Sequence, residues 1–350
     1  MCPIPCLSRL SQYVAGLAVA ILGLLTPQAA ARCGGTDLMA ALALADPAAH
    51  AAILERADRV PNGHGIFWQV RVPQTAPGTE AVPASYLYGT LHSTEAAARW
   101  LPKPAIDALG GARLVMVELT EAEQARLRER LRNDPDFSID HDGPRLSDRL
   151  SADQLARAAR ILAERGLPLE LADKLEPWLL ISAIAVPMCE RAELAIGKKV
   201  LDDAIAAEAT AWGIPIAGLE TFEQTFAAFD ALTDREMTAL LADGFANTAR
   251  EEDLRRTLET LYQQGQVAAI MEFNIWHTGQ VGMMEDARAG AQALSRALIA
   301  TRNHNWLGAL VPELRRGGVF AAFGALHLPG PDGLVELLRA RGFEVVRIGG

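Results

Sequence analysis

Two histidines of this chain lie in the same local context. The octets YLYGTLHS (86–93) and AAFGALHL (321–328) each place an aromatic residue, Gly, a small residue, Leu and His in that order. The chain has only seven histidines, so a context that occurs twice is more informative than either occurrence alone. Neutral imidazole is a common ligand for divalent metal ions and a common proton carrier near neutral pH. His92 and His327 are therefore the first candidates for a reactive site.

A carboxylate lies between these histidines in the sequence. The apolar run RLVMVEL (113–119) is typical of a strand buried on both faces, and Glu118 lies near its end. Both histidines also follow strand-like runs, and a glycine three residues before each lets the backbone turn sharply or approach another group closely. Working side chains of α/β folds lie outside the carboxyl ends of the strands. We expect His92, Glu118 and His327 to converge there as a metal site or an acid–base site.

Each of these residues also has an ordinary explanation. A histidine at a strand end is more often a satisfied polar residue than a ligand, and a glutamate that closes a strand is usually solvated or caps the next helix. The segment TRNHNW (301–306) contains Arg302 and Asn303, which point to a site or simply lie on the surface. GPDG (330–333) precedes a predicted helix and is either an anion site or a simple turn. The sequence has no H-E-x-x-H, G-x-S-x-G or C-x-x-C motif.

The bulk composition is that of a globular protein. The chain has 350 residues, half of them hydrophobic and 22% charged, which is enough for one or two domains with a sizeable core. Its net charge is −10. Nucleic acid is therefore excluded as an expected partner, because no excess of Lys and Arg is present to neutralise phosphates.

The N-terminus has the pattern of a signal peptide. Arg9 is the only charge before a thirteen-residue apolar stretch (13–25), which is short for a membrane span. Ala29 and Ala31 satisfy the small-x-small rule, so we expect cleavage after Ala31, leaving a mature chain of 32–350. The alternative is an uncleaved anchor. Cleavage predicts a periplasmic or secreted protein without a stable membrane span.

The four cysteines fit this export. Cys2 and Cys6 would leave with the leader, and Cys33 and Cys189 would remain in an oxidising compartment. We therefore predict a disulfide between them, although two unrelated thiols are the alternative. Loop closure would make such a bond worth at most about 4–5 kcal/mol.

The order of predicted elements indicates an α/β (α+β) fold. Strands at both ends of the mature chain would form one mixed β-sheet with catalytic residues at strand ends, beginning with a hairpin over 65–91. A large helical insert would occupy about 121–315 of this single domain. The predicted strands are 65–72, 85–91, 113–119, 214–220, 318–326 and 343–348, and the predicted helices are 37–58 with a break at Asp46-Pro47, 102–110, 121–133, 152–165 with Ser151 as N-cap, 171–187, 200–213, further helices within 223–264 and 284–315, and 332–342 capped by Asp332.

Two G-x-x-H motifs with an intervening Glu after an apolar strand resemble the TraB/GumN family, which includes the TIKI metalloproteases. Two longer blocks carry the same resemblance: VLDDAIAAEATAWGIPIAGLETFEQ (200–224) and GALHLPGPDGLVELLRARGFEV (324–345). TRNHNW lies where the family has an Arg-Asn or Arg-Asp element. The resemblance covers roughly 60–349 and is closest to the GumN-like branch.

The resemblance implies an exported hydrolase that depends on a divalent metal ion such as Mn²⁺, Co²⁺ or Zn²⁺. His92, Glu118 and His327 would be its metal ligands or catalytic groups, with Arg302 and Asn303 close by. A peptidase acting on a peptide or small polar substrate with metal-activated water is the implied activity. The alternatives are a non-catalytic accessory or binding protein of the cell envelope, for example in surface polysaccharide production, and a protein that captures a metal or peptide without turnover.

Overall fold

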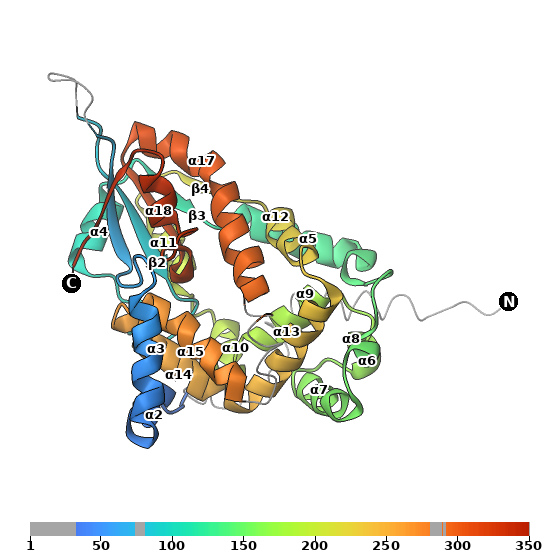
Figure 1. Cartoon of the computed structure of the whole chain (residues 1–350). Helices are drawn as coiled ribbons and strands as arrows, with labels where there is room; N and C mark the ends of the chain where they lie inside the picture. Colours follow the sequence, from blue (N-terminus) through green and yellow to red (C-terminus); the bar gives the residue numbers. More distant parts are fainter. Residues whose placement is uncertain (1–32, 74–80, 281–288, 290–291, 350) are drawn as a thin grey trace.

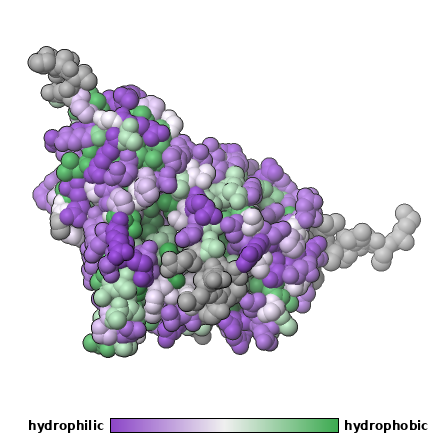
Figure 2. Space-filling model, viewed as in Figure 1, coloured by the Kyte–Doolittle hydropathy of each residue, from purple (hydrophilic) through white to green (hydrophobic). Residues whose placement is uncertain are grey.

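A computed structural model describes residues 33–73, 81–280, 289 and 292–349 (Figure 1). The predicted signal peptide, 1–31, lies outside the described residues. Within the described part of the chain, no helix is long and apolar enough to cross a bilayer. Most of the surface seen in Figure 2 is hydrophilic, and a hydrophobic patch marks the lower left end, where α2 (Leu38–Ala45) lies.

A six-stranded mixed sheet forms the centre of the fold, with strand order β4-β3-β5-β2-β1-β6. The four strands from β4 to β2 are parallel, and β1 runs antiparallel to both β2 and β6. The predicted hairpin over 65–91 is confirmed as the β1–β2 pair. The C-terminal segment completes the sheet as predicted. The strands are β1 (Phe67–Arg71), β2 (Ser85–Thr90), β3 (Leu114–Val117), β4 (Ile216–Gly218), β5 (Val319–Gly324) and β6 (Glu344–Arg347).

Helices cover both faces of this sheet, which explains why its central strands are apolar throughout. Alternate residues of a strand point to opposite faces, so Phe320 packs toward one helical layer and Phe323 toward the other. The helices on the Phe320 face are α4 (Lys103–Gly110) and α11 (Leu201–Ala211), and those on the Phe323 face are α17 (Arg302–Arg316) and α18 (Leu334–Arg339).

Two further helical groups lie beside the sheet (Figure 1). The first packs the N-terminal helices against two helices of the middle of the chain: α2, α3 (Pro47–Asp58), α14 (Glu251–Gln263) and α15 (Val267–Gln280). The second has a hydrophobic core of its own and comprises α5 (Glu121–Asn133), η1 (Pro135–Ser138), α6 (Leu146–Arg149), α7 (Ala152–Glu164), α8 (Leu169–Ala172), α9 (Pro177–Ala185), α12 (Phe222–Asp230) and α13 (Asp234–Asn247). Shorter elements are α10 (Met188–Ala195), η2 (Thr248–Arg250), η3 (Arg296–Thr301) and η4 (Ala325–His327).

Several predicted helix ends are confirmed. Asp46 caps α3 directly before Pro47, and Ser151 caps α7 by accepting from the backbone N–H of Gln154. Gly166 follows α7 with a φ of 76°, a conformation that favours glycine. Part of the predicted 284–315 helical segment, 284–288 and 290–291, lies outside the described residues.

Two local predictions are wrong. The single helix predicted over 171–187 is interrupted between α8 and α9, because Pro177 begins a new helix and disfavours helical backbone in the residue before it. Asp332 does not cap the last helix: the N-cap of α18 is Gly333, and no side chain caps it. The Asp332 carboxylate instead pairs with His304, 3.0 Å away.

The predicted disulfide between Cys33 and Cys189 is present. It joins the first described residue to α10, across 156 positions of sequence. Hydrogen bonds add to this attachment, since Gly34 and Thr36 donate backbone N–H groups to carboxylates of Glu252 and Asp253 at the start of α14.

Candidate metal and catalytic site

The carboxyl ends of β2, β3 and β5 meet at one edge of the sheet. Thr90 at the end of β2 lies opposite Gly324 at the end of β5, so the residues that follow these strands are brought together. His92, Glu118 and His327 all lie around Gly324. A Cβ atom on this glycine would lie 3.3 Å from Glu118 Oε1, 3.7 Å from His327 Cδ2 and 4.0 Å from His92 Nε2. The three candidate side chains therefore surround one point.

The two motif glycines serve this close packing. A Cβ atom on Gly89 would lie 2.9 Å from Ala325 Cα and 2.7 Å from Leu328 Cδ1, both in the segment around His327. Neither Gly89 nor Gly324 has a positive φ. Glycine is needed at position 89 because Ala325 and Leu328 approach its Cα closely, and at position 324 its small size leaves room for the site side chains; neither position requires the left-handed region.

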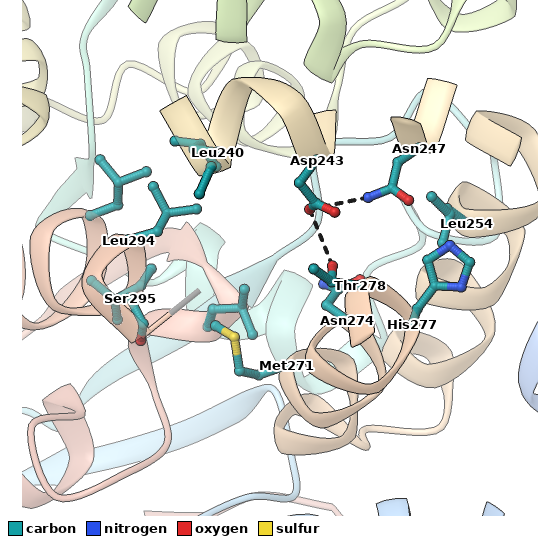
Figure 3. Close-up of a pocket in the computed structure, with 14 residues that line it drawn as sticks. Leu240, Asp243, Asn247, Leu254, Met271, Asn274, His277, Thr278, Leu294 and Ser295 are labelled. Carbon is teal, nitrogen blue, oxygen red and sulfur yellow. Dashed lines mark hydrogen bonds between the residues drawn. The ribbon is translucent and has the colours of Figure 1, made fainter. Parts of the chain in front are cut away.

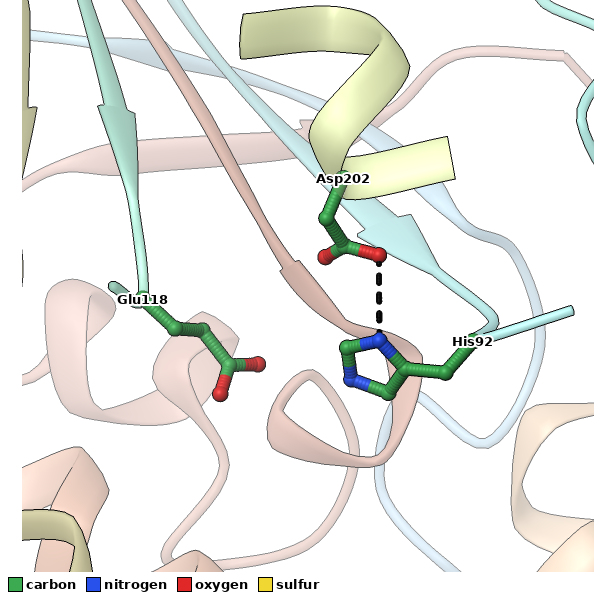
Figure 4. A group of neighbouring side chains, drawn as sticks. All are labelled: His92, Glu118 and Asp202. Carbon is green, nitrogen blue, oxygen red and sulfur yellow. Dashed lines mark ion pairs between the residues drawn. The ribbon is translucent and has the colours of Figure 1, made fainter. Parts of the chain in front are cut away.

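His92 is an exposed side chain held by a carboxylate. Its Nδ1 lies 3.2 Å from Asp202 Oδ2, and 62% of the imidazole is exposed to solvent (Figure 4). Thr90 donates its hydroxyl to the other oxygen, Asp202 Oδ1, at 2.6 Å and so fixes the carboxylate. The charge of Asp202 raises the pKa of His92 above its usual value, although burial opposes this shift and water screens the pair. With Nδ1 facing Asp202, Nε2 is the nitrogen that faces the other candidates.

His327 is buried and held by an amide. Its Nδ1 lies 2.6 Å from Asn303 Oδ1, which can only accept, so Nδ1 carries the proton and Nε2 presents its lone pair. Asn303 is fixed in turn, because its Nδ2 donates to the backbone oxygens of His327 and Asp332 at 3.2 and 2.8 Å. The ring of Trp306 lies 4.2 Å away, centroid to centroid. Burial lowers the pKa of His327 to about 3, so the imidazole is neutral at pH 7.

Glu118 is the ionised group between the two histidines. Its Oε1 accepts the N–H of Gly324 at 2.7 Å and lies 4.0 Å from His327 Nε2, and its Oε2 accepts from Arg302 at 2.6 Å. Burial would raise the pKa of Glu118, but His327, Arg302 and His92 together lower it to about 2. A carboxylate oxygen and a nitrogen lone pair thus face one another.

Arg302 is itself held by a second buried carboxylate, Glu220. Its Nε lies 3.0 and 3.1 Å from the two oxygens of Glu220, and its guanidinium lies 4.8 Å from the centre of the Trp306 ring. Glu220 also accepts from Trp306 Nε1 at 2.8 Å and from Thr225 Oγ1 at 2.8 Å. The Glu220 carboxylate thus bonds to Arg302, Trp306 and Thr225. It holds Arg302 in place, and Arg302 in turn holds Glu118.

Comparison with known protein families adds one finding. The sequence model of the TraB/PrgY/gumN family matches residues 68–347, which is most of the chain. The chain belongs to the TraB/PrgY/gumN family. No match was found among curated proteins or solved structures.

Within this member of the TraB/PrgY/gumN family, Asp202 was not among the predicted site residues. His92, Glu118 and Asp202 each offer a ligand atom, and these atoms all lie within 4.8 Å of one another. Asp202 lies in the first turn of α11 together with Asp203, where an acidic residue is usually read as complementing the helix dipole. Its place in the 200–224 block that resembles the family was the only signal.

These groups can hold a divalent ion by chemistry that fits them. Imidazole nitrogen and carboxylate oxygen bind Zn²⁺ at about 2.0–2.2 Å. Each histidine has its Nδ1 fixed by an oxygen, from Asp202 or Asn303, which is the arrangement that orients metal-binding imidazoles in proteins. His92 Nε2, Glu118 Oε1 and His327 Nε2 are the atoms that could bind an ion, although Glu118 Oε1 also accepts from Gly324 N and His327 Nε2 lies 3.5 Å from Arg302 Nη1. Three protein ligands would leave room for water.

Proposed function

We propose that this member of the TraB/PrgY/gumN family is an exported, divalent-metal-dependent hydrolase, and specifically a peptidase. The contact between His327 Nε2 and Glu118 Oε1 carries the proposal. Two electron-rich atoms face one another across 4.0 Å, so an ion bound by both would need them to approach by about 0.5 Å to reach the tetrahedral spacing. The only donor near His327 Nε2 among the described residues is Arg302 Nη1, whose 3.5 Å contact is long for a hydrogen bond and leaves the lone pair accessible to an ion.

The proposal gives each residue a role. His92, Glu118 and His327 hold the metal, while Asp202 and Asn303 orient the two imidazoles. Glu118 is suited to be a ligand more than a base, because a carboxylate whose pKa is about 2 holds a proton poorly at neutral pH. Arg302 fixes Glu118 in place and balances its charge.

The metal, when bound, would lower the pKa of a water molecule and polarise the scissile carbonyl. The chain would supply the rest of the reaction. Asp202 keeps the exposed His92 ring directed toward the ion, and the neutral state of His327 keeps its Nε2 available as a ligand at pH 7. Exposure of His92 leaves one side of the site open to a substrate.

Export is supported by two features. The first 31 residues have the pattern of a cleavable leader, and the two cysteines that would remain are bonded to each other. Disulfides persist in oxidising compartments and are rare in the cytosol. We therefore assign the mature chain to the periplasm or to the secreted fraction.

Metal content and peptide cleavage test the proposal together. Wild-type protein, purified without chelator, should contain about one divalent ion per chain, as measured by inductively coupled plasma mass spectrometry. It should also cleave members of a peptide library. The His92→Ala/His327→Ala variant should lose both. His64→Ala is the matched control, since His64 is an exposed histidine that pairs with Asp58, which is not a residue of the candidate site. Wild-type protein that binds no divalent ion would rule the mechanism out.

A further inference from the structure

Two cavities that share lining residues lie next to the candidate site. The first, here called the main cleft, has a volume of 730 Å³ and is lined by His92 together with residues of α9, α13 and α14. The second, the side pocket, has a volume of 300 Å³ and is lined by residues of α13, α15 and the segment 294–299 (Figure 3). Leu240, Asp243 and Asn247 of α13 line both cavities, so the two share a wall.

The two G-x-x-H motifs border these cavities as well as the candidate site. Leu91, directly before His92, lines the main cleft, and Leu326, directly before His327, lines the side pocket. Each motif thus directs a histidine to the candidate metal site and a leucine to a neighbouring cavity. A ligand that fills both cavities would pass next to the reactive groups.

Aliphatic side chains supply most of the lining. Ile181 and Ile184 of α9 and Leu258 of α14 line the main cleft, and Met271 and Leu298 line the side pocket. Among the described residues, no Phe, Tyr or Trp lines either cavity. Sugars are usually bound by many polar groups, so this lining fits hydrocarbon side chains better than a polysaccharide.

Few polar side chains line the two cavities, and they lie close to one another. Asn247 and Asn274 line both cavities and offer amide groups, which suit a peptide backbone. In the side pocket, Asp243 accepts from Thr278 and Asn247 at 3.1 and 3.2 Å (Figure 3). Ionisable groups of the main cleft are mainly acidic, with the carboxyl groups of Glu190, Asp243, Glu251 and Glu259 against the guanidinium of Arg255 and the imidazole of His92. Of these carboxyl groups, Glu251 pairs with Arg165, which does not line the cleft.

We propose that the main cleft and the side pocket bind an extended peptide segment with apolar side chains, and that the side pocket takes one large apolar side chain beside the cleaved bond. This inference rests on the proposed peptidase function and names its substrate class. Both volumes lie within the range of ligand sites. The excess of carboxyl groups disfavours acidic peptides.

Binding can be measured apart from cleavage. The probe is a fluorescein-labelled heptapeptide with a central Leu-Phe-Leu, compared with peptides carrying Asn-Ser-Asn or Glu-Ser-Glu instead, and EDTA is added to prevent metal-dependent turnover. Fluorescence anisotropy should show the apolar peptide binding wild-type protein at least about tenfold more tightly than either polar one. Equal affinities for the three peptides would overturn the inference.

Substitutions in the shared wall and in the side pocket test where the peptide binds. Leu240→Asn should weaken apolar-peptide binding about tenfold, and Ala239→Phe should do the same for peptides with a central Phe by filling the side pocket. Leu44→Asn is the matched control, because Leu44 is 88% exposed on α2. Leu240 belongs to none of the hydrophobic clusters of the fold, so its variant should stay folded.

The outcomes separate this inference from the proposed function. Apolar-peptide binding that is lost in Leu240→Asn, with no metal-dependent cleavage, would support the binding site and remove the peptidase. Metal-dependent cleavage with no preference for apolar residues would support the peptidase and overturn the apolar binding site. Saturable binding of palmitate that displaces the apolar peptide, with at least tenfold higher affinity, would identify an acyl chain as the occupant and overturn the peptide assignment.

Discussion

The two histidine turns, residues 89–94 and 324–329, have almost the same sequence context and opposite environments. In the first turn, 62% of the His92 side chain is exposed, and a carboxylate holds it. In the second turn, only 3% of the His327 side chain is exposed, and an amide and an indole ring hold it. The pKa of the first imidazole is raised, whereas that of the second is lowered to about 3.

Partners from distant parts of the chain cause this difference. Asp202 comes from α11, in the middle of the chain, and Asn303 comes from α17, directly before β5. The repeated motif brings both imidazoles to one edge of the sheet, and the helices then set the charge of each. The two histidines therefore share one site although His327 is buried and His92 is exposed. The exposed His92 leaves that side of the site accessible to a substrate.

The first prediction concerns activity, where the two turns should behave alike. His92→Ala and His327→Ala should each lower metal-dependent peptide cleavage by about 100-fold or more, because each would remove a proposed ligand of the same ion. Initial rates at saturating metal measure this, with His64→Ala as the control. A variant of either histidine that keeps wild-type activity would show that the two turns do not serve one site.

The second prediction concerns the disulfide, whose neighbour on α10 is hydrogen-bonded to the first turn. Glu190, next to Cys189, accepts from Ser93 Oγ at 2.8 Å and from Thr94 N at 3.0 Å. A Cys33→Ser/Cys189→Ser variant should lose at most about 4–5 kcal/mol of unfolding free energy. Hydrogen exchange should rise more in residues 89–94 than in 324–329, since the second turn has no such tether.

Thiol labelling provides the control for this experiment. The native exported protein should show no free thiol, and mild reduction should expose two without unfolding the sheet. Equal increases in exchange in both turns would mean that the bond stabilises the domain as a whole and has no particular connection to the first turn.

The fold was largely predictable from the sequence because its signals are local. Apolar runs such as 319–323 identify buried strands, and Ser151 and Asp46 mark helix starts through bonds to nearby backbone groups. The break between α8 and α9 was missed because apolar periodicity continues across it, although Pro177 was a local sign of a helix start.

The candidate site was predictable only in part. Parallel strands explain why His92, Glu118 and His327 meet, since their carboxyl ends share an edge. Asp202 could not be assigned in this way, because it approaches His92 through tertiary packing of a helix 110 positions later. The opposite environments of the two histidines also depend on such packing, which no short motif encodes.

The third prediction separates the two turns by stability. His327→Ala should lower the unfolding free energy of the metal-free protein by about 2–4 kcal/mol, because it leaves a cavity against Trp306 and an unpaired Asn303 oxygen. His92→Ala should change it by about 0.5 kcal/mol or less, as for an exposed side chain. Urea denaturation in EDTA measures both. Similar losses for the two variants would remove the contrast between a buried and an exposed histidine.

The fourth and smallest effect is the pH dependence of stability in the metal-free protein, which should have opposite signs at the two histidines. The pKa of His327 is about 3 in the folded chain and 6.5 when unperturbed, so its contribution is complete above pH 6.5 and is lost as the pH falls. Between pH 7 and pH 5 this loss should reach about 1–2 kcal/mol and be absent in His327→Gln.

The pKa of His92 is raised, so its contribution to stability is complete below pH 6.5 and is lost as the pH rises through the folded value. Solvent screening should keep that contribution below about 1 kcal/mol. Urea midpoints of wild type, His92→Gln and His327→Gln at pH 5, 7 and 8.5 measure both signs, and parallel profiles for the two variants would show that the two imidazoles share one environment.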